Sequence, residues 1–166
     1  MIISKIFKNT LLILAACLVL TACATKKEVA IDSDAKESQM QSDVYTGTDS
    51  VEYLADGVPD RVFFATNETI LTTASRETLR AQAAWLRKNS SINVVLEGHA
   101  DERGTREYNL ALGERRANSA KDYLMTYGIS SDRISVLSYG KERPVDAGSN
   151  HLAWSKNRRS VTVKAN

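Results

Sequence analysis

One stretch of the sequence, Glu97–Tyr127 (EGHADERGTREYNLALGERRANSAKDYLMTY), decides the fold. It reads as the end of a strand, a polar loop and a long helix that starts at about Arg106. At about 100° per residue, the helix gathers apolar residues such as Leu112 on one face. Arg116 lies in the middle of that face. Because its guanidinium stays charged, Arg116 requires either an internal partner or a ligand carboxylate.

Strands and helices alternate on both sides of this stretch, as they do in α/β proteins. Short β-rich runs predict strands at Arg61–Phe64, Ile92–Gly98, Arg133–Tyr139 and Arg159–Lys164. Helical patterns predict a helix over Ser75–Lys88 and a helical turn near His151–Lys156, and Gly128 provides a left-handed end for the long helix. We therefore expect one α/β sandwich over residues 57–166, with helices packed on a single mixed sheet.

Residues 1–22 have the features of a signal peptide. Lys5 and Lys8 give this segment a basic start. The apolar run Leu11–Leu20 that follows is too short to be a good membrane span, and small residues come after it. The protein is therefore expected to be exported across the cytoplasmic membrane.

The end of the signal peptide predicts a lipid anchor. Residues 20–23, LTAC, resemble the lipobox of bacterial lipoproteins, in which the cysteine is lipidated; an ordinary secretory signal is the alternative. Cys17 is removed with the signal peptide, so Cys23 is the only remaining cysteine and no internal disulfide is possible. In the same resemblance, Ala24 after the cysteine implies the outer membrane as the destination.

Residues 23–56 are rich in Ser, Asp, Lys, Gln and Thr and show no sustained period, which predicts a flexible tether. Residues 24–60 contain three lysines and nine acids, whereas residues 61–166 contain seventeen basic and eleven acidic residues. A basic domain suits nucleic acid, but export argues against that partner and favours anionic cell-wall material. The opposite charges also make docking of the acidic segment on the basic domain conceivable.

Residues with chemical potential gather around the end of the predicted second strand. Glu97, His99 and Asp101 offer three metal ligands, but the only other histidine is His151 and the predicted domain has no thiol. A histidine that hydrogen-bonds the loop is the preferred interpretation. The sequence has no G-x-S-x-G elbow and no phosphate-binding loop, so we predict no metal, cofactor or catalytic nucleophile.

Asp101 and Arg116 form the most informative pair. A turn of the chain at Gly104 would bring them into a common crevice, open to solvent. One interpretation is a structural salt bridge, since buried arginines are usually paired. The other is a binding site for a zwitterionic amino-acid end, whose carboxylate would meet the guanidinium and whose ammonium would meet Asp101. Asn109, on the same helix face as Arg116, would add a hydrogen bond.

Several motifs in a fixed order give a specific resemblance. They are EGHADERGT at residues 97–105, EYNLALGERRA at 107–117, SYGKERP at 138–144 and WSKNRR at 154–159. Together they are similar to the OmpA-like peptidoglycan-binding domain, and the match extends from Arg61 to Val163. This resemblance implies a mixed four-stranded sheet with flanking helices. It also implies non-covalent binding of the meso-diaminopimelate end of a cell-wall stem peptide.

The resemblance also assigns ligand-binding positions. The family's loop aspartate falls on Asp101 and its helix arginine on Arg116. Ala65 and Asn67 replace aspartates that are frequent in the family's first-strand segment, and Ala147 and Ala153 replace two loop cysteines of related sequences. The predicted site comprises Phe64, Thr66, Asn67, Asp101, Thr105, Asn109, Leu112 and Arg116.

By this resemblance the protein is a non-enzymatic anchor that tethers the outer membrane to the cell wall, with its domain facing the periplasm. A second hypothesis, compatible with the first, is an interaction module for a periplasmic protein such as TolB. A wall-cleaving enzyme is a third and less favoured hypothesis. A wall fragment should bind unchanged under the first hypothesis, bind poorly without the partner under the second, and be cut under the third.

Overall fold

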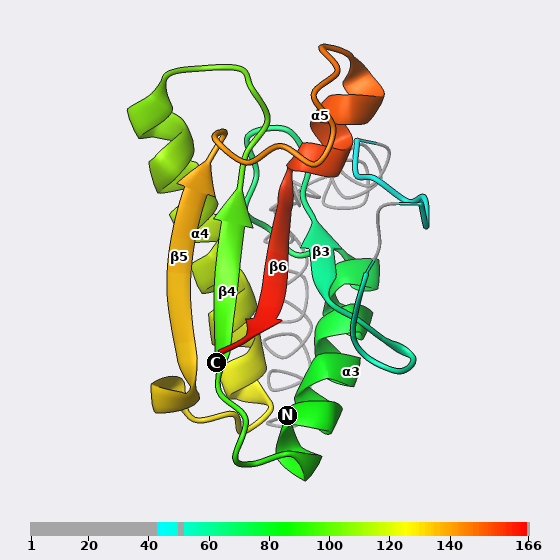
Figure 1. The fold of residues 1–166 in the computed structure, drawn as a ribbon, viewed down its shortest axis with the longest axis vertical. Helices are drawn as coiled ribbons and strands as arrows, with labels where there is room; N and C mark the ends of the chain where they lie inside the picture. The colour runs from blue at the N-terminus through cyan, green and yellow to red at the C-terminus, as the bar shows by residue number, and fades with distance from the viewer. Residues whose placement is uncertain (1–42, 50–51, 166) are drawn as a thin grey trace, which may run out of the picture. The chain divides into compact units, whose positions relative to one another are not determined.

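The structure is a computed structural model that describes residues 43–49 and 52–165 (Figure 1). The predicted signal peptide, the lipobox cysteine Cys23 and most of the predicted tether lie outside the described residues. Within the described part, no helix combines the length and the apolar composition that crossing a membrane requires.

The described chain forms a four-stranded mixed sheet with two long helices on one face, as predicted (Figure 1). The strand order is β3-β6-β4-β5, in which β4 and β5 are parallel and the other neighbours antiparallel. A small antiparallel hairpin, β1–β2, precedes the sheet. The elements are β1 Tyr53–Ala55, β2 Val58–Pro59, β3 Arg61–Phe63, α3 Thr73–Lys88, β4 Val94–His99, α4 Arg106–Thr126, the 3-10 turn η1 Ser131–Arg133, β5 Ile134–Gly140, α5 His151–Asn157 and β6 Arg159–Lys164.

Helix α4 lies very close to strand β4. A Cβ atom added at Gly98 of β4 would meet the carbonyl oxygen of Gly113 at 1.8 Å, so only glycine is compatible with this approach. Arg116 follows Gly113 by about one helical turn and therefore points at the end of β4 and the loop beyond it. The close helix–strand contact thus fixes where the guanidinium of Arg116 lies.

The hydrophobic core fills the space between the helices and the sheet. The predicted apolar face of α3 is confirmed, since Leu79, Ala83 and Leu86 are buried. Gly128 has a φ of 82° just after α4 ends, which confirms the predicted left-handed cap. The core cluster contains Val62, Phe64, Leu71, Leu79, Ala83, Leu86, Val94, Leu96, Ala117, Ala120, Leu124, Ile129 and Ile134.

The predicted boundary between tether and domain, at residue 56, is too far along the chain. Tyr45 is 7% exposed and packs edge-on against Phe63, with ring centroids 4.8 Å apart. Asp49 forms an ion pair of 2.8 Å with Lys156 of α5. An isolated aromatic residue and acidic side chains therefore dock residues 43–49 on the basic domain, the alternative that the charge distribution had left open.

Candidate functional site

Arg116 is the most deeply buried charged residue at the predicted site, with an exposure of 0%. Each of its three nitrogens donates to a main-chain carbonyl: Nε to Glu68 (3.0 Å), Nη1 to His99 (2.9 Å) and Nη2 to Ala65 (3.0 Å). Its guanidinium carbon also lies 5.4 Å from the ring centre of Phe64. Burial lowers the pKa of Arg116 to about 10, which still leaves the group charged at neutral pH.

The prediction that Asp101 and Arg116 meet in an open crevice is wrong. Among the described residues, no carboxylate forms an ion pair with Arg116. Asp101 instead binds Arg103, with Nη2 at 2.7 Å from Oδ2 and Nε at 3.0 Å from Oδ1. Arg103 is only two residues further along the loop, and its guanidinium occupies both oxygens of the Asp101 carboxylate. Arg116 is left to bind carbonyl oxygens.

The three carbonyl contacts make Arg116 a clamp between two loops. It ties residues 65–68, which follow β3, to His99 at the end of β4. Asn67 in the first of these loops has a φ of 58°, a conformation that asparagine tolerates better than most residues. Its side chain accepts a hydrogen bond from the Tyr108 hydroxyl at the start of α4. The clamp therefore shapes the loop that contains the predicted residues Thr66 and Asn67.

Asp101 contacts two arginines, Arg103 and Arg158. It is 7% exposed, and its Oδ2 also lies 3.5 Å from Nη1 of Arg158. Burial opposes ionisation of Asp101, but hydrogen bonds from Arg103 outweigh it and hold the pKa below its ordinary value. Arg103 Nη2 also donates to the Thr66 hydroxyl at 3.3 Å, which links the two predicted loops.

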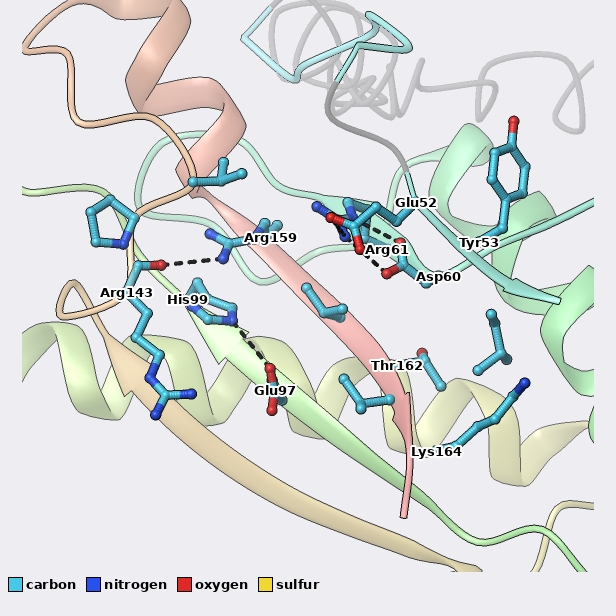
Figure 2. A pocket seen from close by; sticks show the side chains of 15 residues that line it. Glu52, Tyr53, Asp60, Arg61, Glu97, His99, Arg143, Arg159, Thr162 and Lys164 are labelled. Carbon is cyan, nitrogen blue, oxygen red and sulfur yellow. Dashed lines mark hydrogen bonds and ion pairs between the residues drawn. The ribbon is translucent and has the colours of Figure 1, made fainter. Parts of the chain in front are cut away.

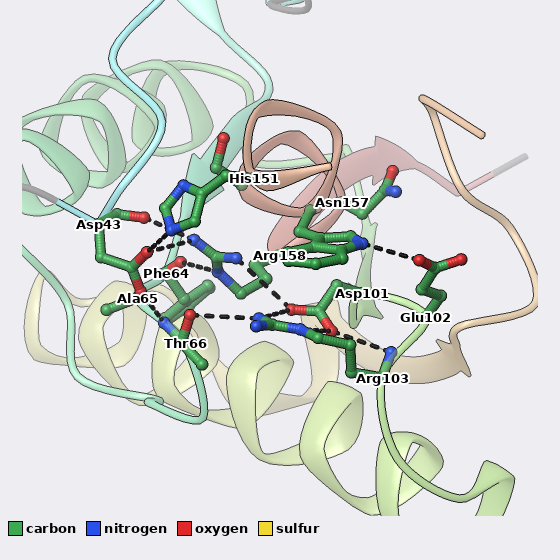
Figure 3. Close-up of polar contacts among 12 residues, drawn as sticks. Asp43, Phe64, Ala65, Thr66, Asp101, Glu102, Arg103, His151, Asn157 and Arg158 are labelled. Atoms are coloured by element: carbon green, nitrogen blue, oxygen red, sulfur yellow. Dashed lines mark hydrogen bonds and ion pairs between the residues drawn. The ribbon is translucent and has the colours of Figure 1, made fainter. Parts of the chain in front are cut away.

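Arg158 sits at the edge of this group and binds carboxylates. Its side chain is 1% exposed, and its Nε donates to the Phe64 carbonyl at 3.0 Å. Its Nη2 donates to Oδ1 of Asp43 at 3.1 Å, while the main-chain N–H of Thr66 donates to Oδ2 of Asp43 at 2.6 Å (Figure 3). His151 Nε2 lies 3.2 Å from Asp43 Oδ1. Thr66, Arg158 and His151 thus form a cradle for one carboxylate, which we call the carboxylate cradle.

The other predicted residues surround this group but differ in accessibility. Asn109 Nδ2 donates to the Arg103 carbonyl at 2.8 Å, and the Thr105 hydroxyl caps α4 by accepting from the Tyr108 N–H at 3.2 Å. Phe64 and Leu112 are buried and support the site from below. The structure therefore brings the predicted residues to one end of the sheet, with Phe64, Asn109, Leu112 and Arg116 beneath its surface.

The sequence pattern missed Arg103, Arg158 and Asp43. Arg158 belongs to the Asn-Arg-Arg run before the last strand, and two adjacent arginines there indicate that one of them points away from the sheet. Arg103 lies in the predicted polar loop itself. Nothing in the pattern around Asp43 distinguishes it from the other linker acids.

His99 does not join this site. It is buried on the other face of the sheet, where it lines a cavity of about 580 Å³ together with Arg143 and Arg159 (Figure 2). Its ring nitrogens have no hydrogen-bond partner within the described part of the chain, so the predicted hydrogen bond to the loop is not found. Burial, together with the nearby arginines, lowers the pKa of His99 to about 3. His99 is therefore neutral at physiological pH.

Metal ligands were the alternative interpretation of Glu97, His99 and Asp101. Glu97 Oε2 lies 3.9 Å from His99 Nε2 beside the cavity, whereas Asp101 binds Arg103 and Arg158 in the other group. Across residues 43–49 and 52–165, no three potential ligands are grouped closely enough to hold a metal ion.

Comparisons with known proteins agree with the fold and the motifs. Residues 63–158 match the OmpA family. The peptidoglycan-associated lipoproteins of Mesorhizobium japonicum and Rhizobium meliloti are 40% and 42% identical, over 97% and 95% of this chain and 95% and 89% of theirs. The crystal structure of the peptidoglycan-associated lipoprotein from Burkholderia pseudomallei is 32% identical, with a TM-score of 0.62 over 64% of this chain and 90% of that one. The chain therefore belongs to the OmpA family, and the relatives to which it is similar are peptidoglycan-associated lipoproteins.

Proposed function

We propose that the protein binds peptidoglycan non-covalently at the group formed by Asp101, Thr66 and Arg158, and so tethers the outer membrane to the cell wall. The observation that carries the proposal is the carboxylate cradle beside Asp101. A diaminopimelate end is zwitterionic, so its carboxylate fits the cradle, and its ammonium would take the place of the Arg103 side chain, which is 40% exposed, on Asp101. Arg158 contacts both Asp43 and Asp101, which places the two charge sites within reach of one small ligand.

The remaining predicted residues take different roles in this proposal. Asn67 and Thr105 supply polar groups at the rim, whereas Asn109 is buried and holds the loop through its bond to the Arg103 carbonyl. Arg116 is a positioning residue, because its side chain is completely buried and three of its five N–H groups donate to main-chain carbonyl oxygens. It holds the 65–68 loop so that the Thr66 N–H points into the cradle. Its role as direct receptor of the ligand carboxylate passes to Arg158, whose partner Asp43 is a linker carboxylate that a ligand can replace.

The proposed binding is tested with a soluble form of the mature chain that carries Cys23→Ser. Calorimetric titration with a diaminopimelate stem peptide should show saturable binding, and mass spectrometry should recover the peptide uncut. Asp101→Ala should weaken binding about ten- to a hundredfold, because a charge-assisted hydrogen bond in a desolvated site is worth about 1.5–3 kcal/mol.

Asp122→Ala is the matched control, since Asp122 is an exposed carboxylate on α4. It should bind like the parent chain. Equal binding by Asp101→Ala and Asp122→Ala would remove Asp101 from the site, and a cleaved peptide would favour the enzyme hypothesis.

The anchor and the protein partner complete the proposal. Lipidation of Cys23 would hold the chain at the outer membrane, facing the periplasm. The same domain would meet TolB as part of the Tol–Pal system. Cys23→Ser should leave the protein in the soluble periplasmic fraction, still folded and still able to bind the wall. Retention of this variant in outer-membrane lipid after wall digestion would contradict the anchor assignment.

A further inference from the structure

We propose that Asp43 is a built-in competitor for the ligand: its carboxylate occupies the carboxylate cradle, and the wall peptide binds only after residues 43–49 have left. This inference rests on the proposed function, because it assigns the occupant that the wall peptide must displace. The inference concerns residues 43–49 of the linker, which supply no group that binds the wall peptide in the proposed function.

The contacts of Asp43 use the donors that a ligand carboxylate would need. Oδ2 accepts from the Thr66 N–H at 2.6 Å and Oδ1 from Arg158 Nη2 at 3.1 Å, so both oxygens are engaged (Figure 3). The main-chain carbonyl of Asp43 takes a further bond of 2.5 Å from the same Nη2. With Asp43 in place, the Arg158 side chain is only 1% exposed. A second carboxylate cannot accept from the same Thr66 N–H and Arg158 Nη2, so the two occupants exclude one another.

The docked segment is fixed by contacts that suit a reversible attachment. Tyr45 packs against Phe63, and Lys156 pairs with Asp49, whose side chain is 65% exposed. Exposed ion pairs contribute little to stability, so the aromatic contact and the cradle supply most of the attachment. The side chain of Asp43 is itself 23% exposed and lies at the open edge of the cradle. The segment can leave without any change in the sheet or in the clamp formed by Arg116.

The expected effect follows from the population of the docked state. Only the open fraction of the molecules can bind the peptide, so the apparent affinity equals the intrinsic affinity multiplied by that fraction. A chain that is docked for about 90% of the time therefore binds about tenfold more weakly. Removing the competitor should therefore strengthen binding, which is the opposite of what loss of a ligand contact does.

The test titrates the diaminopimelate stem peptide into the mature chain with Cys23→Ser, with and without Asp43→Ala. Asp43→Ala should bind about tenfold more tightly. Tyr45→Ala should also bind more tightly, because it weakens docking without touching the cradle. Asp56→Ala removes an exposed acid from the turn after β1 and controls for the change in net charge; it should leave the affinity unchanged. Unchanged or weaker binding by Asp43→Ala would overturn the inference.

Hydrogen exchange provides a second readout. Saturating peptide should speed hydrogen exchange of the amides of residues 44–49. The Thr66 amide should stay protected, because the ligand carboxylate replaces Asp43 as its hydrogen-bond acceptor. Protection of both segments with peptide bound would also overturn the inference. Loss of binding in Asp101→Ala together with unchanged affinity in Asp43→Ala would reject the competitor and keep the wall site. Absence of binding in every variant would reject the wall site as well.

Discussion

Two arginines next to Phe64 are buried almost equally, yet they meet different acceptors. Arg116 donates to three main-chain carbonyls, whereas Arg158 donates to the carboxylates of Asp43 and Asp101 as well as to the carbonyls of Phe64 and Asp43. The carbonyl acceptors of Arg116 belong to residues 65, 68 and 99 of the folded domain and stay in place. A carboxylate from a linker can be exchanged for a carboxylate from a ligand. Burial of an arginine therefore says little about its role, and the nature of its acceptors says much more.

The largest expected effect is on stability, at Arg116. Arg116→Ala should lower the free energy of unfolding by about 3–5 kcal/mol, because it leaves a cavity and three unpaired carbonyl oxygens. Urea denaturation followed by circular dichroism measures this change. The neighbouring Arg115→Ala is the control, since Arg115 is exposed, and it should change stability by less than about 0.5 kcal/mol. A stable Arg116→Ala variant that fails to bind peptide would reverse the roles of the two arginines.

The second effect is on affinity, at Arg158. Arg158→Ala should weaken binding of the diaminopimelate stem peptide about a hundredfold, because the ligand carboxylate loses a charge-assisted partner in a desolvated site. Arg158→Lys should recover little, since an ammonium lacks the planar fork. Calorimetry under conditions where both variants are folded measures the change. Normal affinity in Arg158→Ala would show that the carboxylate binds elsewhere.

The choice of ligand tests the same contact from the other side. Diaminopimelate carries one carboxylate more than lysine at the end of its side chain, so lysine-type stem peptides should bind about ten- to a hundredfold more weakly. The difference should shrink in Arg158→Ala and persist in Arg115→Ala. Equal affinity for both peptides in the parent chain would remove the cradle from ligand selection.

A smaller effect is expected at His99, on the face of the sheet away from the cradle. Its folded pKa of about 3 lies below the unfolded value of 6.5, so the unfolded state takes up the proton first on acidification. The stability that this histidine contributes is complete above pH 6.5 and is lost as the pH falls toward 3. Between pH 6.5 and 5 the loss should be about 1.5 kcal/mol. His99→Gln should show a shallower pH dependence of the free energy of unfolding; an identical slope would mean that another group titrates in this range.

The sequence was sufficient for the sheet and the helices, and the residues that it proposes for the site lie at one end of the sheet. It was not sufficient for the partners of the arginines there. The apolar face of α4 can be recognised from its side-chain pattern, and the structure buries that face. The motif around Asp101 is likewise a side-chain pattern. The acceptors of Arg116 are main-chain atoms of residues 65, 68 and 99, which no side-chain pattern records. Docking of the linker was equally hidden, since it depends on the single aromatic Tyr45 and on one acid among several.

A crystal structure of the mature chain bound to a diaminopimelate stem peptide tests the central claim most directly. The account predicts the ligand carboxylate on the Thr66 N–H and Arg158, its ammonium on Asp101, and Asp43 displaced from the cradle. The three carbonyl contacts of Arg116 should be unchanged. A ligand carboxylate bound directly by Arg116, or a peptide seated in the cavity beside His99, would contradict it.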